Sequence, residues 1–229
     1  MKKLMAMLLS VVLCLGVCSF CAAEEMNPDY VGAWKLDSVS LMGVSLSKDE
    51  LDWTSEMYIY ENGDCFFIKD DIIAVLPLVP QNGAYIINAG DVVWPLMLNE
   101  QGLLELEMAV EGLVMDLTMA RNLMPVETDA QCLSFVGDWR LNYVDLLGIQ
   151  LGEEELGKVD MKIYDSGYGI LNMEGVSSAF RLILLEEQVL MLDSEGMTFP
   201  IRHGENGLII FELIEEGLTM QFVMEPASI

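Results

Sequence analysis

Apolar and polar residues alternate with a period of two along most of the chain, which is typical of strands that bury one face. The pattern is clearest in residues 104–108, Leu-Glu-Leu-Glu-Met, and in residues 113–119, where alternate positions are Leu or Met. Turn-forming pairs such as Asn62-Gly63 and Asn206-Gly207 separate the alternating segments. The pattern predicts an all-β chain folded as an antiparallel meander.

The chain is a tandem duplication. Val31-Gly32-Ala33-Trp34-Lys35-Leu36 recurs as Val136-Gly137-Asp138-Trp139-Arg140-Leu141, a separation of 105 residues. This period far exceeds the roughly 20 to 50 residues of a solenoid repeat, so each copy is expected to bury a core of its own. We predict one domain over residues 27–121, a second over 135–229, and a linker over 122–134.

Each copy is predicted to contain about eight short strands. The first copy has them near 32–40, 55–61, 64–69, 72–78, 83–88, 91–98, 102–109 and 112–120. The second has them near 137–145, 159–165, 168–174, 178–185, 187–193, 196–202, 207–214 and 217–225. Helical turns are expected only at 47–51, where Ser47 and Glu50 fit a capping box, and at 153–156.

The sheets are predicted to close into barrels. No segment fits a crossover helix, which excludes a parallel sheet. A meander of this length protects its edge strands most completely by closing on itself.

The first residues have the features of an export signal. Lys2 and Lys3 precede an apolar run from Leu4 to Phe20, and small residues at positions 22–23 favour cleavage after Ala23. We therefore predict a signal peptide over residues 1–23 and a secreted, extracellular or cell-surface location. Two alternatives stay open: a retained membrane anchor, and a lipid anchor on Cys18.

The chain is strongly acidic, with 11 Lys and Arg against 37 Asp and Glu residues among its 229. Removal of residues 1–23 leaves 9 basic residues and a formal charge of −28. Such a charge repels phosphate backbones and anionic lipid headgroups, which argues against nucleic-acid binding and electrostatic membrane docking. Solubility of an otherwise apolar chain accounts for most of the carboxylates.

Only Cys65 and Cys132 remain once the signal segment is removed. In an exported protein they could form a disulfide between the linker and the first domain, and two buried thiols serve equally well. Neither cysteine has a counterpart in the other copy, so the fold does not depend on them.

Gly-x-Trp opens the first strand of each copy, as Gly32-Ala33-Trp34 and Gly137-Asp138-Trp139. This motif resembles the lipocalin signature and, over each whole copy, the compact lipocalin-like domains of exported bacterial proteins. The resemblance implies that the tryptophan packs across the closed end of the barrel, beneath a basic residue after the last strand. Arg121 occupies that position in the first copy, whereas the second copy has Pro226.

The resemblance implies a non-enzymatic binding module for a small apolar or amphipathic ligand. An eight-stranded barrel can hold one small ligand or be filled by its own side chains. The candidate inward residues favour filling: Trp34, Leu36, Met57, Ile59, Met115, Leu117 and Met119. The alternative function is a cell-surface structural or protein-interaction module with filled barrels.

No catalytic, metal or cofactor site is expected. His203 is the only histidine and has no equivalent in the first copy, where Leu98 aligns, so a catalytic triad or histidine-based metal site lacks its central residue. Adjacent carboxylates such as Asp70-Asp71 point to opposite faces of a strand and cannot flank one bond.

A surface cluster of aromatic residues is the remaining candidate for recognition. Trp53, Tyr58 and Tyr60 lie near the second strand of the first copy, and Tyr60 returns as Tyr164. If they point outward, these residues form a possible recognition patch, although packing against the other domain would explain them as well. The partner would be an unknown small ligand or protein.

Overall fold

The structure is a computed structural model of the chain. It describes residues 26–70, 72–81, 83–89, 92–110, 113–124, 127–173, 175–215 and 218–227. The predicted signal peptide, with Cys18, lies outside the described residues. The chain divides into two compact units, one up to residue 125 and one from residue 126. Among the described residues, no helix combines the length and apolar character needed to cross a bilayer.

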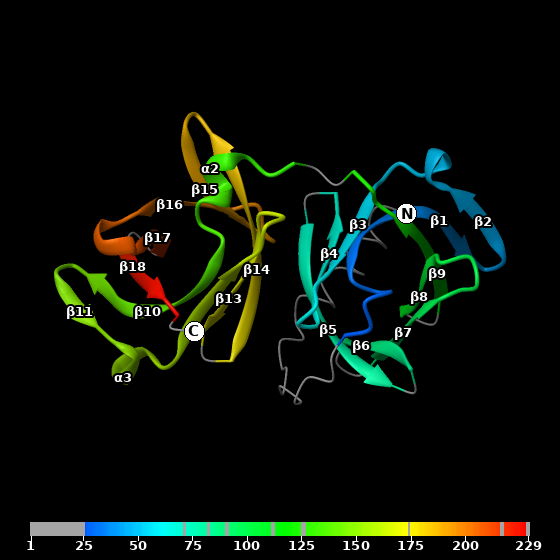
Figure 1. The fold of residues 1–229 in the computed structure, drawn as a ribbon, viewed down its shortest axis with the longest axis horizontal. Helices are drawn as coiled ribbons and strands as arrows, with labels where there is room; N and C mark the ends of the chain where they lie inside the picture. The colour runs from blue at the N-terminus through cyan, green and yellow to red at the C-terminus, as the bar shows by residue number, and fades with distance from the viewer. Residues whose placement is uncertain are drawn as a thin grey trace. The chain divides into compact units, whose positions relative to one another are not determined.

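The first unit is a single curled antiparallel sheet (Figure 1). Its elements are β1 (Gly32–Leu41), β2 (Val44–Ser47), η1 (Lys48–Glu50), β3 (Ser55–Ile59), β4 (Asp64–Lys69), β5 (Ile72–Gln81), β6 (Ala84–Ala89), β7 (Val92–Leu98), β8 (Leu104–Val110) and β9 (Leu113–Arg121). Strands β3 to β9 follow β1 in chain order, and β1 also pairs with β9. This pairing closes a ring of eight strands, with β2 attached outside it.

The second unit repeats this arrangement. Its elements are α2 (Ala130–Leu133), β10 (Gly137–Leu146), β11 (Ile149–Leu151), α3 (Glu153–Leu156), β12 (Val159–Ile163), β13 (Tyr168–Met173), β14 (Val176–Leu185), β15 (Gln188–Asp193), β16 (Thr198–His203), η2 (Glu205–Gly207), β17 (Ile209–Glu215) and β18 (Leu218–Pro226). Pairing of β10 with β18 returns the sheet to its first strand.

The predicted fold class, two tandem antiparallel meander barrels, is confirmed. The helical turns expected at 47–51 and 153–156 are present as η1 and α3. Strands β2 and β11 were not predicted, because Met42-Gly43 and Leu147-Gly148 are not common hairpin-turn pairs. Helix α2 falls inside the predicted linker, and its Cys132 belongs to the core of the second unit.

Side chains from alternate strand positions fill the first ring. Trp34, Met57, Leu104 and Met119 are among those with essentially no exposed surface. All the candidate inward residues belong to this core or, for Met115, pack against it. The second unit has a matching core around Met161, Phe211 and Met224. Because apolar burial supplies most of the favourable free energy of folding, these two cores stabilise the rings.

A shift of register occurs at the same place in the first strand of each ring. In β1 it lies between Leu36 and Ser38, opposite β9, and in β10 it lies between Leu141 and Tyr143, opposite β18. An extra residue in one strand of an antiparallel pair bends that strand and increases its twist. The first strand of each copy is thereby curved where it completes the ring.

Both remaining cysteines are buried free thiols, each in the core of its own unit. Burial raises the pKa of the Cys65 thiol well above its ordinary value. The pKa of Cys132 is also raised, first by burial and then by the neighbouring carboxylate of Asp129. The structure therefore corresponds to the two-thiol alternative and contains no disulfide between them.

These thiols are expected to resist alkylation in the native protein. Because the thiolate is the reactive form, a raised pKa lowers the reactive fraction throughout the neutral pH range, and burial blocks the reagent as well. With the chain from residue 24 onward, iodoacetamide at pH 8 should leave Cys65 and Cys132 unmodified, as measured by mass spectrometry. Denaturation in urea should expose both. Rapid alkylation of the folded protein would contradict their placement in the cores.

Candidate functional site

One end of the first barrel is closed by the residues of its Gly-x-Trp motif. Trp34 is fully buried, and its indole Nε1 donates a hydrogen bond to the carbonyl of Tyr30 at 2.9 Å. The Arg121 guanidinium lies over the Trp34 ring, 4.1 Å from its centroid, and donates hydrogen bonds to the carbonyls of Asp29 and Val31. The basic residue that the lipocalin resemblance implied thus covers this tryptophan.

Gly32 is required by this closure. Its φ of 131° is unfavourable for residues with a side chain, and a Cβ atom there would lie 2.5 Å from Nη1 of Arg121. The motif glycine therefore leaves room for the guanidinium.

Two tyrosines fill the same end of the first barrel beside Trp34. The rings of Tyr30 and Tyr85 meet edge to face with centroids 4.7 Å apart. The Tyr30 hydroxyl accepts a hydrogen bond from the backbone N–H of Leu98 at 3.2 Å, and the Tyr85 hydroxyl accepts one from that of Asn27 at 2.7 Å. This pair is both packed and hydrogen-bonded.

The second barrel closes differently. Trp139 lies opposite Pro226, which has no charge to place over the indole ring. Its Nε1 still donates to a carbonyl, that of Phe135, at 2.9 Å. Phe135 replaces Tyr30 of the first copy, and its ring stacks on His203 with a centroid distance of 4.2 Å and an interplanar angle of 6°. His203 in turn stands where the first copy has Leu98.

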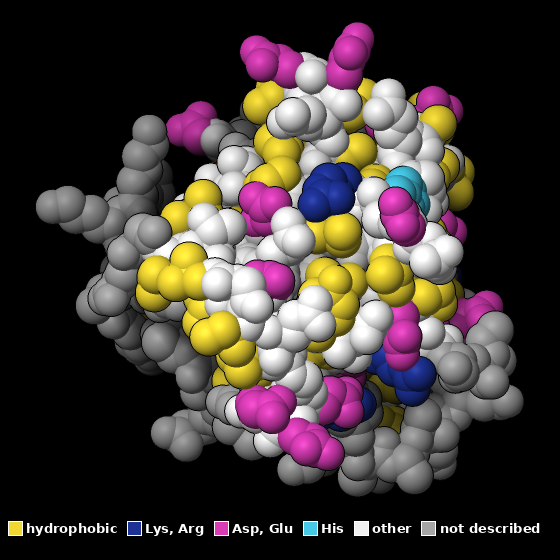
Figure 2. All heavy atoms as spheres, turned by 90° about the vertical axis from the view of Figure 1, so that its left-hand side faces the viewer, with side chains coloured by type: hydrophobic (Ala, Val, Ile, Leu, Met, Phe, Trp, Pro, Cys, Tyr) yellow, Lys and Arg dark blue, Asp and Glu magenta, His cyan; other side chains and the backbone are white. Residues whose placement is uncertain are grey.

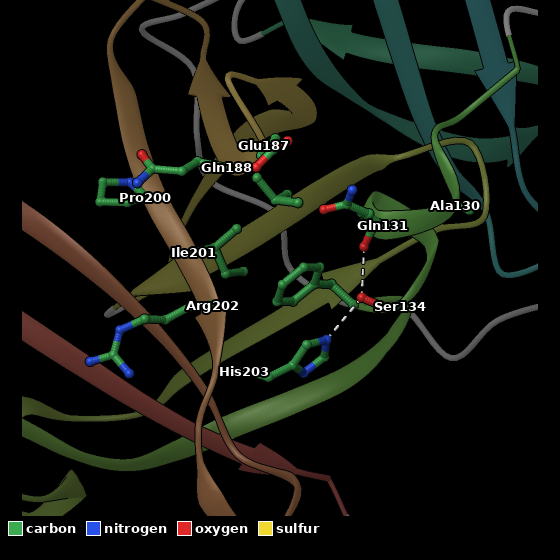
Figure 3. Close-up of a pocket in the computed structure, with 11 residues that line it drawn as sticks. Ala130, Gln131, Ser134, Glu187, Gln188, Pro200, Ile201, Arg202 and His203 are labelled. Atoms are coloured by element: carbon green, nitrogen blue, oxygen red, sulfur yellow. Dashed lines mark hydrogen bonds between the residues drawn. The ribbon is translucent and has the colours of Figure 1, made fainter.

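An open groove of about 640 Å³ lies at this end of the second barrel, next to α2, β16 and the turn between β14 and β15 (Figure 3). Phe135, Val189 and Ile201 form its apolar part. Its polar part includes Gln131 and Ser134 of the α2 segment, Glu187 of the turn and Gln188 at the start of β15. We call this site the α2 groove. Its volume lies within the roughly 300–1,000 Å³ of small-molecule pockets.

Consecutive residues of β16 point to opposite sides of the strand beside the α2 groove. In Figure 3, Ile201 and His203 extend toward α2, whereas Arg202 extends to the opposite side. This follows from the alternation of side chains along a strand. Arg202 is one of the residues that line the groove, but its guanidinium is directed away from α2.

A difference in side-chain size between the two copies explains the groove. Pro95 pairs with Ile86, and the equivalent Pro200 pairs with Leu190. Ile86 and Leu190 are therefore equivalent, and so are the residues that precede them, Tyr85 and Val189. In the first unit the Tyr85 ring packs against Tyr30. Val189 lacks that ring, and the corresponding space beside Phe135 is open.

Ser134 and His203 form a polar contact at the edge of the α2 groove. The Ser134 Oγ lies 2.8 Å from His203 Nε2 and also donates to the Gln131 carbonyl at 2.6 Å. A hydroxyl has a single proton, so His203 must donate to Ser134 through Nε2–H. This polarity is opposite to that of a general base that activates a serine nucleophile.

The aromatic residues of the predicted recognition patch lie in both units. Tyr58 and Tyr164 are buried, and Trp53 and Tyr60 are half-buried. Lys69 lies over the Trp53 ring at 5.3 Å, and Lys162 lies over the Tyr164 ring at 5.1 Å. The role of these residues in recognition stays a prediction.

Comparison with known proteins places this site in no established class. No family model matches the chain, and no curated protein matches it. A crystal structure of a protein of unknown function from the DUF3598 family of Nostoc punctiforme aligns with a TM-score of 0.28 and 13% identity, over 87% of this chain and 97% of that one. A candidate outer membrane protein from Bacteroides fragilis aligns with a TM-score of 0.25 and 10% identity, over 86% and 97%. Similarity this low carries no argument about function.

Possible metal ligands are likewise dispersed. In the part of the chain that the structure describes, no group of three or more His, Cys, Asp or Glu side chains could hold a metal ion. The α2 groove is therefore the site whose chemistry we develop. Sequence analysis gave no role to Phe135 or Val189 and used His203 only to argue against a triad or metal site. A comparison of the two copies at these three positions could have pointed to the groove.

Substitution of Arg121 tests the closure of the first barrel. Arg121→Ala removes the cation–π contact and two charge-assisted hydrogen bonds, and should lower the free energy of unfolding by about 2 kcal/mol. The matched change Arg140→Ala removes an exposed ion pair with Glu225 and should cost less than about 1 kcal/mol. Urea unfolding followed by tryptophan fluorescence measures both. Equal effects would contradict a closing role for Arg121.

Substitution of His203 tests the wall of the α2 groove. His203→Ala removes the stacking on Phe135 and the hydrogen bond to Ser134, and should lower the free energy of unfolding by about 1 kcal/mol. Arg202→Ala, on the other side of β16, should change it by less than about 0.5 kcal/mol. If the two variants unfold at the same urea concentration, the stacked pair does not stabilise the second barrel.

Proposed function

We propose that this chain is an exported, non-enzymatic binding protein of lipocalin-like type that holds a small amphipathic molecule in the α2 groove. The observation that carries the proposal is the open, largely apolar groove at the end of the second barrel, where the first barrel has a packed tyrosine. The second copy has Val189 where the first has Tyr85, and the barrel around this position is retained. Such a change makes space for a ligand.

The packed barrel interiors argue for a ligand in the α2 groove and against a ligand inside either barrel. Apolar side chains from strands around each ring pack together in its interior. They include Trp34 and Leu106 in the first unit and Ile209 and Phe211 in the second. Each of these four is at most 1% exposed. Because protein interiors pack as densely as organic crystals, such cores leave little room for a guest molecule.

The residues of the α2 groove suggest the chemistry of the ligand. Phe135, Val189 and Ile201 offer an apolar surface for its body. The side chains of Gln131, Ser134 and Gln188 can donate to and accept from a polar head. Glu187 and the net charge of −26 on the whole chain disfavour an anion, and Arg202, which also lines the groove, directs its guanidinium away from α2. We therefore favour an uncharged or cationic head over a fatty-acid carboxylate.

The hydrogen bonds at Ser134 support a binding role over catalysis. Ser134 gives its proton to the Gln131 carbonyl and receives one from His203, so the pair is arranged as a bridge that fixes α2 against β16. The pair thus supplies a rigid polar edge to the groove. A preformed edge lowers the entropic cost of ordering a ligand.

Filling the α2 groove with the side chain of the first copy tests the proposal. Val189→Tyr should abolish binding of Nile red, an uncharged amphipathic dye whose fluorescence rises in apolar surroundings. The wild-type chain should bind the dye and should bind anionic anilinonaphthalene sulfonate more weakly. Fluorescence titration at fixed ionic strength measures both affinities.

Val176→Tyr provides the matched control, because Val176 lies at the start of β14, is 55% exposed and lies outside the α2 groove. It should bind Nile red like the wild-type chain. Circular dichroism and urea unfolding should show that both variants keep their fold. Undiminished dye binding by Val189→Tyr would reject the α2 groove as the ligand site.

A further inference from the structure

The turn between β14 and β15, which borders the α2 groove, differs between the two copies. Strand pairing leaves Glu186 and Glu187 as the two residues between these strands. The equivalent pairing of β5 with β6 leaves positions 82–83, where the sequence has Asn82-Gly83. The second copy thus has two glutamates where the first has a common hairpin-turn pair.

The backbone of this turn is unfavourable for residues with side chains. Glu186 and Glu187 have φ values of 49° and 66°. Two successive positive φ angles define the type I′ turn, for which Asn-Gly is preferred because a Cβ atom crowds the neighbouring carbonyl oxygen. In the part of the chain that the structure describes, no other two neighbouring residues both have a side chain and a positive φ. Asn-Gly would therefore suit the fold better here.

Glu187 brings a carboxylate to the α2 groove. It is one of the residues that line the groove, whereas Glu186 is not. In the view of Figure 3, Gln131 extends from α2 in the direction of Glu187. The Glu187 carboxylate and the side-chain oxygen of Gln131 are both hydrogen-bond acceptors.

The carboxylate of Glu187 is not neutralised by a basic residue of the described chain. None of the ion pairs among the described residues includes Glu186 or Glu187. Arg202 also lines the groove, but its guanidinium is directed away from α2. The charge of Glu187 is therefore available to a ligand.

The charge and the space arise on the same hairpin of the second copy. Val189 in place of Tyr85 opens the groove, and Glu187 in place of Gly83 adds the carboxylate two residues earlier. A ligand pocket combines an apolar surface with a few polar groups that fix the orientation of the ligand. A carboxylate in that position favours a molecule with an apolar body and a cationic head.

We infer, on the basis of the function proposed above, that the α2 groove takes an amphipathic amine. Its protonated nitrogen donates hydrogen bonds to the carboxylate of Glu187 and to the side-chain oxygen of Gln131. Its apolar body lies against Phe135, Val189 and Ile201. A primary ammonium has three N–H donors, and its hydrogen bonds to a carboxylate are roughly twice as strong as those between neutral groups. An alcohol lacks this charge, and a fatty acid is repelled by Glu187.

Displacement of Nile red by three competitors with one apolar body tests the head group. Octylammonium, octanol and octanoate differ only at that end. The wild-type chain should bind octylammonium about tenfold more tightly than octanol, and octanoate more weakly than octanol. Fluorescence titration at pH 7 and a low, fixed ionic strength measures the three affinities.

Glu187→Gln and Glu186→Gln form a matched pair of variants. Each removes one negative charge from the same turn, and only Glu187 lines the groove. Glu187→Gln should lose the preference for octylammonium and bind octanol like the wild-type chain, whereas Glu186→Gln should keep the preference. An equal loss in both variants would show that net charge attracts the amine without a contact to Glu187, and would overturn the inference.

A double variant separates recognition from folding. Glu186→Asn combined with Glu187→Gly gives the turn the sequence of the first copy. This variant should unfold at a higher urea concentration than the wild-type chain, because the turn is relieved of its crowded Cβ atoms, and should lose the preference for octylammonium. A lower unfolding midpoint would show that the two glutamates serve the fold, and would reject their role in recognition.

The same titrations separate failure of the amine from failure of the binding site. If Nile red does not bind the wild-type chain, or if its binding survives Val189→Tyr, the α2 groove is not a ligand site and both proposals fall. If the dye occupies the groove but the three competitors displace it equally, only the amine is rejected. Strongest displacement by octanoate would likewise reject the amine and would indicate an anionic ligand.

Discussion

The pairing between the first and last long strands of each copy, β1 with β9 and β10 with β18, is the constraint on which the rest of the structure depends. It removes the open edges of a long meander and directs alternate side chains into a single interior. Once the ring is closed, the interior must be filled, and the end where the first strand begins must be covered. The tryptophan of Gly-x-Trp is held there in both units by the same indole-to-carbonyl hydrogen bond.

The two copies differ in the residues that cover this end of the barrel. The first uses a cation above its tryptophan and a tyrosine pair beside it, so the polar atoms of the closure are satisfied inside the unit. The second has proline opposite the tryptophan, with a phenylalanine–histidine stack and the short helix α2 in place of these contacts. A duplicated barrel can change its covering residues in this way because strand pairing and the apolar core hold the ring itself.

The strands were predictable because their alternation appears independently in two copies, and the capping box of Ser47 and Glu50 marked η1 through local hydrogen bonding. Helix α2 was not predictable, since four residues have little helical preference of their own and this helix depends on burial of Cys132. The α2 groove escaped sequence analysis for a different reason. The equivalence of Tyr85 and Val189 follows from cross-strand register, and the space depends on one missing ring.

Strand β10 connects the two ends of the second unit. It begins beside Trp139, at the end with the α2 groove, and finishes at Leu146, where the chain turns into β11. Ten extended residues span about 30 Å, so the groove and the β10–β11 turn lie far apart on one strand. Under the function proposed above, a small molecule in the groove would leave the far end of the unit uncovered.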